Sequence, residues 1–296
     1  MKVGKLLVNL MMRAIMKDVN KRTSSQDLSA FEIDYNLPYL NDGNEYHIFD
    51  YLHARGTKKN ICIIDVHGGS YLFCRCHDNL YYASKYALEG YDVLCLDYRP
   101  NDGKTGSTKD LIDQVAEGII YIFNHLKELG LENHRFVLTG DSAGGHISLL
   151  LAEAISDQEF AKQLGYEFNK VKIEGVLVNS PAYDFNNLGR EILTKSGLKR
   201  MFGPRYNDEE LNKLISPKEH ILSLNMPIFV STSKLDFLRA EPLALKADLE
   251  RLNKTHQFID IDSDNKKADH VHNVVHPDIE ESIKVNQMMM DFINNL

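Results

Sequence analysis

Ser142 has the sequence surroundings expected of a nucleophile. It lies in the middle of Gly140-Asp-Ser-Ala-Gly144, a G-x-S-x-G pattern, between an apolar run at 136–138 and an Ala/Leu-rich run at 147–155. The first run predicts a buried strand and the second a helix. A serine on a tight strand-to-helix turn presents its hydroxyl beyond the sheet edge, and only small residues such as glycine fit beside it. The pattern therefore predicts covalent catalysis in which Ser142 attacks an acyl carbon.

Such a nucleophile needs N–H donors for the negative charge that forms on the carbonyl oxygen. Gly68 and Gly69 follow an apolar run at 61–66 that predicts a strand, and glycine backbone can approach a ligand closely. The N–H of Ala143, directly after the nucleophile, is the other donor expected for this oxyanion hole. His67 precedes the two glycines and is interpreted as a structural residue that bonds to neighbouring backbone.

The carboxylate that orients the catalytic base is expected beyond the end of a strand. Asp236 follows the apolar run at 228–231, and the order serine, acid, histidine along the chain agrees with this kind of site. Asp260 and Asp262 alternate within the last predicted strand, and Asp141 precedes the nucleophile on the wrong side of its turn. A helix cap is the competing interpretation of Asp236.

Three histidines are candidates for the base. His270, His272 and His276 follow the last predicted strand, at 258–261. A zinc site is the competing interpretation of this cluster, but no second group of Cys, His and Asp supplies the further ligands. We therefore expect neither a metal nor a cofactor.

Apolar runs that alternate between strand-like and helix-like lengths predict the elements that position these residues. The predicted strands are 31–35, 46–51, 61–66, 91–96, 136–138, 176–179, 228–231 and 258–261, and the predicted helices are 79–89, 109–129, 147–155, 241–252 and 279–293. Such alternation predicts an α/β fold, a mostly parallel sheet with helices on both faces. The first two strands flank a turn at 41–44 and are expected to form an antiparallel hairpin at one edge.

Composition limits the partners of this chain. Its 34 Lys and Arg residues against 42 Asp and Glu residues give a net charge of −8, which argues against nucleic acid and anionic membranes. Residues 1–16 have apolar residues at helical spacing but no signal-peptide cleavage site. We expect this segment to pack on its own domain, with a membrane-surface role as the weaker interpretation. No segment is long and apolar enough to span a membrane.

The cysteines agree with a cytoplasmic protein. Cys62 and Cys95 lie in apolar runs, and Cys74 and Cys76 lack the C-x-x-C spacing of common zinc or redox sites. We expect all four to be free thiols. Nothing in the sequence fixes the oligomeric state, so a homodimer remains open.

Four motifs together resemble the hormone-sensitive-lipase-like branch of the α/β-hydrolases. They are H-G-G-S at 67–70, G-D-S-A-G-G at 140–145, Ser180-Pro181 with Asp184, and L-D-x-L-R at 235–239. The resemblance spans residues 60–296 and implies a single hydrolase domain over 1–296, with cap elements at about 1–25 and 185–215. It implies hydrolysis of small carboxylic esters through an acyl-serine intermediate. It also implies that His270 is the base, because this residue leads the triplet that reads H-G-F in the family.

Three positions depart from the family pattern. Ser70 replaces the third glycine of H-G-G-G, 100–103 replaces the usual run after D-Y-R, and His272 replaces an aromatic residue. We expect a pocket for short acyl groups, lined by Tyr71, Phe73, Phe185 and Phe202. An amide-cleaving relative, such as an arylformamidase or a peptidase, and a non-catalytic ligand receptor on the same fold are the alternatives.

Overall fold

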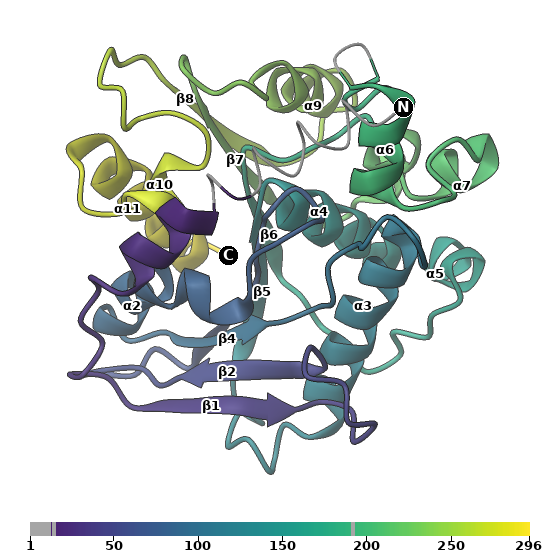
Figure 1. Cartoon of the computed structure of the whole chain (residues 1–296). Coiled ribbons are helices and arrows are strands. Elements are labelled where there is room, and N and C mark those ends of the chain that lie inside the picture. Colours follow the sequence, from purple (N-terminus) through teal and green to yellow (C-terminus); the bar gives the residue numbers. More distant parts are fainter. Residues whose placement is uncertain (1–12, 14–15, 191–192) are drawn as a thin grey trace.

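A central sheet of eight strands organises the molecule (Figure 1). This computed structural model describes residues 13, 16–190 and 193–296. The strand order is β1-β2-β4-β3-β5-β6-β7-β8. The strands span Ile33–Pro38 (β1), Ile48–Leu52 (β2), Ile61–Val66 (β3), Asp92–Leu96 (β4), Arg135–Asp141 (β5), Gly175–Asn179 (β6), Ile228–Ser233 (β7) and His256–Ile261 (β8).

The sheet is mostly parallel. Strands β3 to β8 pair with one another in parallel, whereas β2 pairs antiparallel with both β1 and β4. The predicted edge hairpin and the predicted parallel sheet are therefore confirmed. Because parallel strands end on the same side, the loops after β3, β5, β7 and β8 meet at one edge of the sheet.

Helices cover both faces of the sheet. They span Leu80–Leu88 (α2), Thr108–Asn124 (α3), Ala143–Ser156 (α4), Gln158–Leu164 (α5), Lys195–Phe202 (α6), Glu209–Leu214 (α7), Pro217–His220 (α8), Ala240–Arg251 (α9), His272–Val275 (α10) and Glu280–Asn294 (α11), with short 3₁₀ turns at Cys76–Asn79 and Ile221–Ser223. Ile61 and Ile63 of β3 pack with α2 and α11 in one hydrophobic cluster. Cys62 and Ile64, on the opposite face, pack with α3 and α4 in the other.

Helix α3 ends earlier than the sequence predicts. It stops at Asn124 rather than near residue 129. His125 leaves the helical conformation, with φ −122° and ψ 23°, and its ring bonds to the carbonyl of Tyr121. The remaining apolar residues, such as Leu126 and Leu129, belong to a turn that packs against the core.

Both predicted cap elements are described only in part. The interval 185–215 holds helices α6 and α7, which lie together in the upper right of Figure 1, although residues 191–192 lie outside the described part. Most of the predicted N-terminal helix, at 1–12 and 14–15, also lies outside the described residues. Among the helices that the structure describes, none has the length and hydropathy of a membrane span.

Candidate active site

Ser142 occupies a strained turn between β5 and α4. Its backbone angles are φ 52° and ψ −112°, a conformation that non-glycine residues seldom adopt. A Cβ added to Gly144 would lie 2.0 Å from the carbonyl oxygen of Val66, and one added to Gly140 would lie 2.5 Å from the carbonyl oxygen of Gly144. Both glycines of the motif are thus required by the close approach of backbone around this turn.

The structure brings Ser142, His270 and Asp236 into one hydrogen-bonded line. His270 Nε2 lies 2.9 Å from Ser142 Oγ, and His270 Nδ1 lies 2.6 Å from Asp236 Oδ1. With the ring proton on Nδ1, the imidazole donates to the carboxylate and its Nε2 can accept the serine proton. This is the arrangement needed to activate a serine hydroxyl.

Asp236 is held in place from two further sides. Thr232 Oγ1 donates to its Oδ2 at 2.9 Å, and the Leu238 N–H donates to its Oδ1 at 2.8 Å. Burial raises the pKa of this carboxyl, but the hydrogen bond and positive charge of His270 outweigh burial and bring the pKa below its usual value. The helix-cap interpretation is wrong, because the residue that caps α9 is Arg239.

Of the three candidate histidines, His270 is the one that meets the serine. His272 begins α10, is buried, and bonds through Nδ1 to Ser282 Oγ of α11 at 2.8 Å. Burial lowers the pKa of His272 to about 4, so its imidazole is neutral at physiological pH. His276 follows α10 and is partly buried.

The sequence predicts that the Gly68 N–H binds the oxyanion, but the structure gives this N–H another acceptor. The Gly68 N–H donates to Asp141 Oδ1 at 3.0 Å, so it is not free to bind an oxyanion. The N–H groups of Gly69 and Ala143 have no acceptor among the described residues. Gly69 adopts φ 109°, and Ser70 adopts φ 53°, in the place of the third glycine of the family motif. The predicted pair of glycine donors is therefore reduced to Gly69.

Asp141 belongs to a buried polar cluster that sequence reasoning did not identify. The Asn79 side-chain amide donates both to Asp141 Oδ1, at 3.0 Å, and to Asp65 Oδ2, at 2.9 Å. Burial, with the neighbouring charge of Asp141, raises the pKa of Asp65 to about 7. Asp65, a charged residue inside the otherwise apolar run 61–66, was the available signal, since such a residue needs a polar partner inside the protein.

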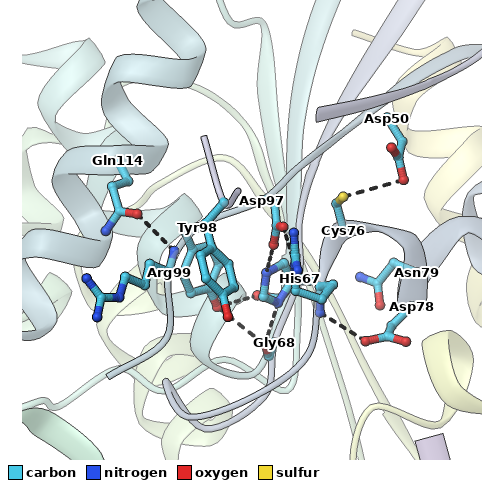
Figure 2. Close-up of polar contacts among 12 residues, drawn as sticks. Asp50, His67, Gly68, Cys76, Asp78, Asn79, Asp97, Tyr98, Arg99 and Gln114 are labelled. Atoms are coloured by element: carbon cyan, nitrogen blue, oxygen red, sulfur yellow. Dashed lines mark hydrogen bonds and ion pairs between the residues drawn. The ribbon is translucent and has the colours of Figure 1, made fainter. Parts of the chain in front are cut away.

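His67 contacts the backbone of the glycine loop through its imidazole (Figure 2). Its Nδ1 lies 2.8 Å from the carbonyl oxygen of Gly68 and its Nε2 lies 3.1 Å from Asp97 Oδ1. The imidazole stacks on Tyr98 with ring centroids 4.2 Å apart, and the Tyr98 hydroxyl donates to the His67 carbonyl. The structural interpretation of His67 agrees with these contacts.

The four residues predicted to line the pocket differ in burial and in their ring contacts. Tyr71, Phe185 and Phe202 contact one another edge to face, with ring centroids between 5.0 and 6.0 Å apart, and all three are buried in the main hydrophobic core. Phe73 is partly exposed and makes none of these ring contacts. Tyr71 follows the glycine loop in sequence and joins it to this aromatic cluster, whose role in substrate binding stays a prediction.

Two other features lie away from the catalytic residues. A cavity of about 360 Å³ is lined by residues 99–102, Thr105 and Gly106, by residues of α3 between Asp110 and Glu117, and by Asn44 and His47. Asp50, Cys76 and His77 lie close enough together to hold a metal ion. The Cys76 thiol, however, donates to Asp50 Oδ2 at 3.4 Å (Figure 2), and Asp50 Oδ1 accepts the N–H of Asn36.

Curated relatives of this chain are esterases and other hydrolases. It is 29% identical over 136 residues to the Arabidopsis thaliana protein named "Probable isoprenylcysteine alpha-carbonyl methylesterase ICMEL2", a match that covers 45% of this chain and 31% of the relative. It is 28% identical over 153 residues to the Mycobacterium tuberculosis protein named "Probable carboxylic ester hydrolase LipM", which covers 50% of this chain and 35% of that relative. The chain thus spans about a third of the length of these relatives.

Solved structures with the same fold match nearly the whole chain. Esterase B from Lactobacillus rhamnosis superposes with a TM-score of 0.87 at 18% identity, over 99% of this chain and 96% of that one. A bacterial heroin esterase superposes with a TM-score of 0.71 at 16% identity, over 97% and 91%. The α/β-hydrolase fold predicted from the motifs is confirmed. The BD-FAE family model matches residues 50–238, well over half of the sequence, and the chain therefore belongs to the BD-FAE family of α/β-hydrolases.

Proposed function

We propose that this protein is a serine carboxylesterase that hydrolyses esters of short acyl groups through an acyl-serine intermediate. The observation that carries the proposal is the line from Ser142 Oγ through His270 to Asp236, with distances of 2.9 and 2.6 Å. Curated relatives that are named as ester hydrolases support it.

In the first half of the reaction, Ser142 Oγ bonds to the acyl carbon while its proton moves to His270 Nε2. Asp236 stabilises the imidazolium that results, and its low pKa keeps it ionised for this purpose. The charge on the carbonyl oxygen is held by the N–H groups of Gly69 and Ala143. When the carbon–oxygen ester bond breaks, His270 gives its proton to the leaving alcohol.

The second half releases the acid. A water molecule gives a proton to His270 Nε2 as its oxygen attacks the acyl-serine, and the same donors hold the second oxyanion. Breakdown returns the proton to Ser142 Oγ and frees the carboxylic acid. No metal or cofactor takes part in either half of the proposed reaction.

The size of the acyl group is proposed from the packing around the glycine loop. Tyr71 follows this loop and packs on Phe185 and Phe202, which come from the predicted cap interval. Three rings already in mutual contact leave little room for a long chain. A second crystal structure of esterase B is described as inhibited by a tributyrin phosphonate, an analogue with short acyl chains, and this supports the same size class.

A phosphonate label tests the mechanism directly. The purified protein is treated with a fluorophosphonate and digested, and the modified peptide is identified by mass spectrometry. The proposal predicts one label, on Ser142, that appears together with loss of nitrophenyl acetate hydrolysis. Because His272→Ala keeps the triad, it should still be labelled, whereas His270→Ala should react far more slowly. A label on another serine, or hydrolysis that continues after full labelling, would show that the serine assignment is wrong.

A further inference from the structure

Phe237 lies against the catalytic imidazole from the solvent side. Its ring centroid is 4.2 Å from that of His270, with 46° between the two planes. The side chain is 79% exposed. Phenylalanine is among the residues most often buried, so one that is exposed and also touches a catalytic residue invites an explanation.

Folding does not account for this side chain. The turn is stabilised by the residues on either side of Phe237, because Asp236 is buried and Leu238 packs against the main core. The Leu238 N–H also fixes the Asp236 carboxylate. Phe237 itself buries little apolar surface. A variant with a polar residue at this exposed position should therefore be about as stable as the wild type.

The chemistry of the triad indicates which half of an ester this ring would meet. His270 Nε2 must reach the oxygen of the leaving alcohol to protonate it, so the alcohol half of the substrate passes beside the imidazole. The carbonyl oxygen lies on the other side, at the N–H groups of Gly69 and Ala143. The Phe237 ring, tilted against the solvent side of the imidazole, therefore borders the path of the alcohol half to solvent.

We propose that Phe237 is a specificity-determining residue that binds the alcohol half of the ester and favours aromatic or bulky apolar alcohols over small ones. This inference rests on the proposed esterase function and adds the class of alcohol to it. An aromatic alcohol would stack on the exposed face of Phe237, whereas methyl and ethyl groups are too small to reach it. One good aromatic contact of this kind corresponds to roughly a threefold to tenfold preference.

The test compares two acetates with the same acyl group, benzyl acetate and ethyl acetate. Their alcohols leave with similar ease, so the ratio of the two kcat/KM values reports mainly on contacts with the alcohol half. We expect Phe237→Ala to lower kcat/KM for benzyl acetate about threefold to tenfold and to leave ethyl acetate little changed. Phe237→Tyr, which keeps the ring, should retain the preference.

Leu222→Ala is the matched control, because Leu222 is also a large apolar residue, 69% exposed, on the 3₁₀ turn that precedes β7. It should leave both acetates unchanged. An equal loss on both acetates in Phe237→Ala would overturn the inference and show that the ring only orients His270. No change on either acetate would overturn it as well.

Failure of the esterase proposal would look different. In that case neither acetate would be hydrolysed by the wild type in a manner that Ser142→Ala abolishes, and both proposals would fall together. Ethyl acetate hydrolysis that depends on Ser142, combined with an unchanged benzyl preference in Phe237→Ala, would refute the Phe237 inference alone.

Discussion

Asp141 Oδ1 accepts the Gly68 N–H at 3.0 Å, so the residue before the nucleophile fixes the loop that faces it. The two residues are far apart in sequence but lie at the ends of the adjacent strands β5 and β3. A Cβ on Gly68 would lie 2.2 Å from Asp141 Oδ2, so the backbone at Gly68 is too close to this carboxylate to carry a side chain. The aspartate of G-D-S-A-G-G therefore positions the N–H groups of the residues that follow Gly68.

Removing this contact should harm catalysis more than substrate binding. In Asp141→Ala the buried Gly68 N–H loses its acceptor, which costs about 1–3 kcal/mol, and the glycine loop can move away from Ser142. We expect a fall in kcat on nitrophenyl acetate by a factor of about 10²–10³, as when an oxyanion donor is lost, with a smaller change in KM.

Asp141→Asn is the matched control, because its amide oxygen can still accept the Gly68 N–H. It should keep much of the kcat that Asp141→Ala loses. Equal losses in the two variants would mean that the negative charge of Asp141, rather than its hydrogen bond, is what matters.

The identity of the base can be tested with two histidine variants. His270→Ala removes the only acceptor that the described structure places on Ser142 Oγ, so kcat should fall on the order of 10³-fold or more. His272→Ala removes a buried bond to Ser282 and should act mainly through stability, with a lowered midpoint of urea unfolding and substantial remaining activity. The reverse order of the two activities would make His272 the base.

Much of the fold could be predicted from sequence because its strands are short, apolar and separated by helices. The predicted bounds of β3 agree with the structure, and those of β4 differ by one residue, because both strands are mostly apolar runs. The end of α3 could not be predicted, because apolar residues continue past Asn124 while His125 terminates the helix through its own conformation.

Part of the candidate site could also be predicted from the sequence of the strands. Ser142 and Asp236 follow strand ends, and this places them at one edge of the sheet. The sequence does not predict which backbone N–H is free to bind the oxyanion, because Gly68 and Gly69 look equivalent in sequence. The side chain of Asp141, which comes from another strand, distinguishes them. No sequence pattern predicts the contact of Phe237 with His270, because it joins two loops that are distant in sequence.

The proposed acyl preference can be tested with esters of rising chain length. We expect kcat/KM on nitrophenyl esters to be highest between acetyl and about hexanoyl and to fall for longer chains, because the packed rings leave little room for a long acyl chain. Phe202→Ala opens space next to Tyr71 and should shift the preference toward longer acyl chains. Higher kcat/KM on palmitoyl than on butyryl esters in the wild type would contradict the proposed size class.

The buried pair of carboxyl groups predicts a dependence of stability on pH. Burial and the charge of Asp141 raise the pKa of Asp65 to about 7, whereas the unfolded chain loses this proton near its ordinary value of 3.8. Between these two pH values the folded state holds one more proton than the unfolded state. The contribution of Asp65 to the free energy of unfolding must therefore fall as pH rises from about 4 to about 7.

Asp65→Asn isolates that contribution, because the amide oxygen can still accept the Asn79 hydrogen bond but carries no charge. Urea unfolding of the variant and the wild type is compared at pH 5 and pH 8, so that titrating groups that do not interact with Asp65 cancel in the difference. Relative to the wild type, the variant should gain about 2–4 kcal/mol between pH 5 and pH 8. A difference that stays constant across this range would mean that Asp65 does not take up a proton in the folded state.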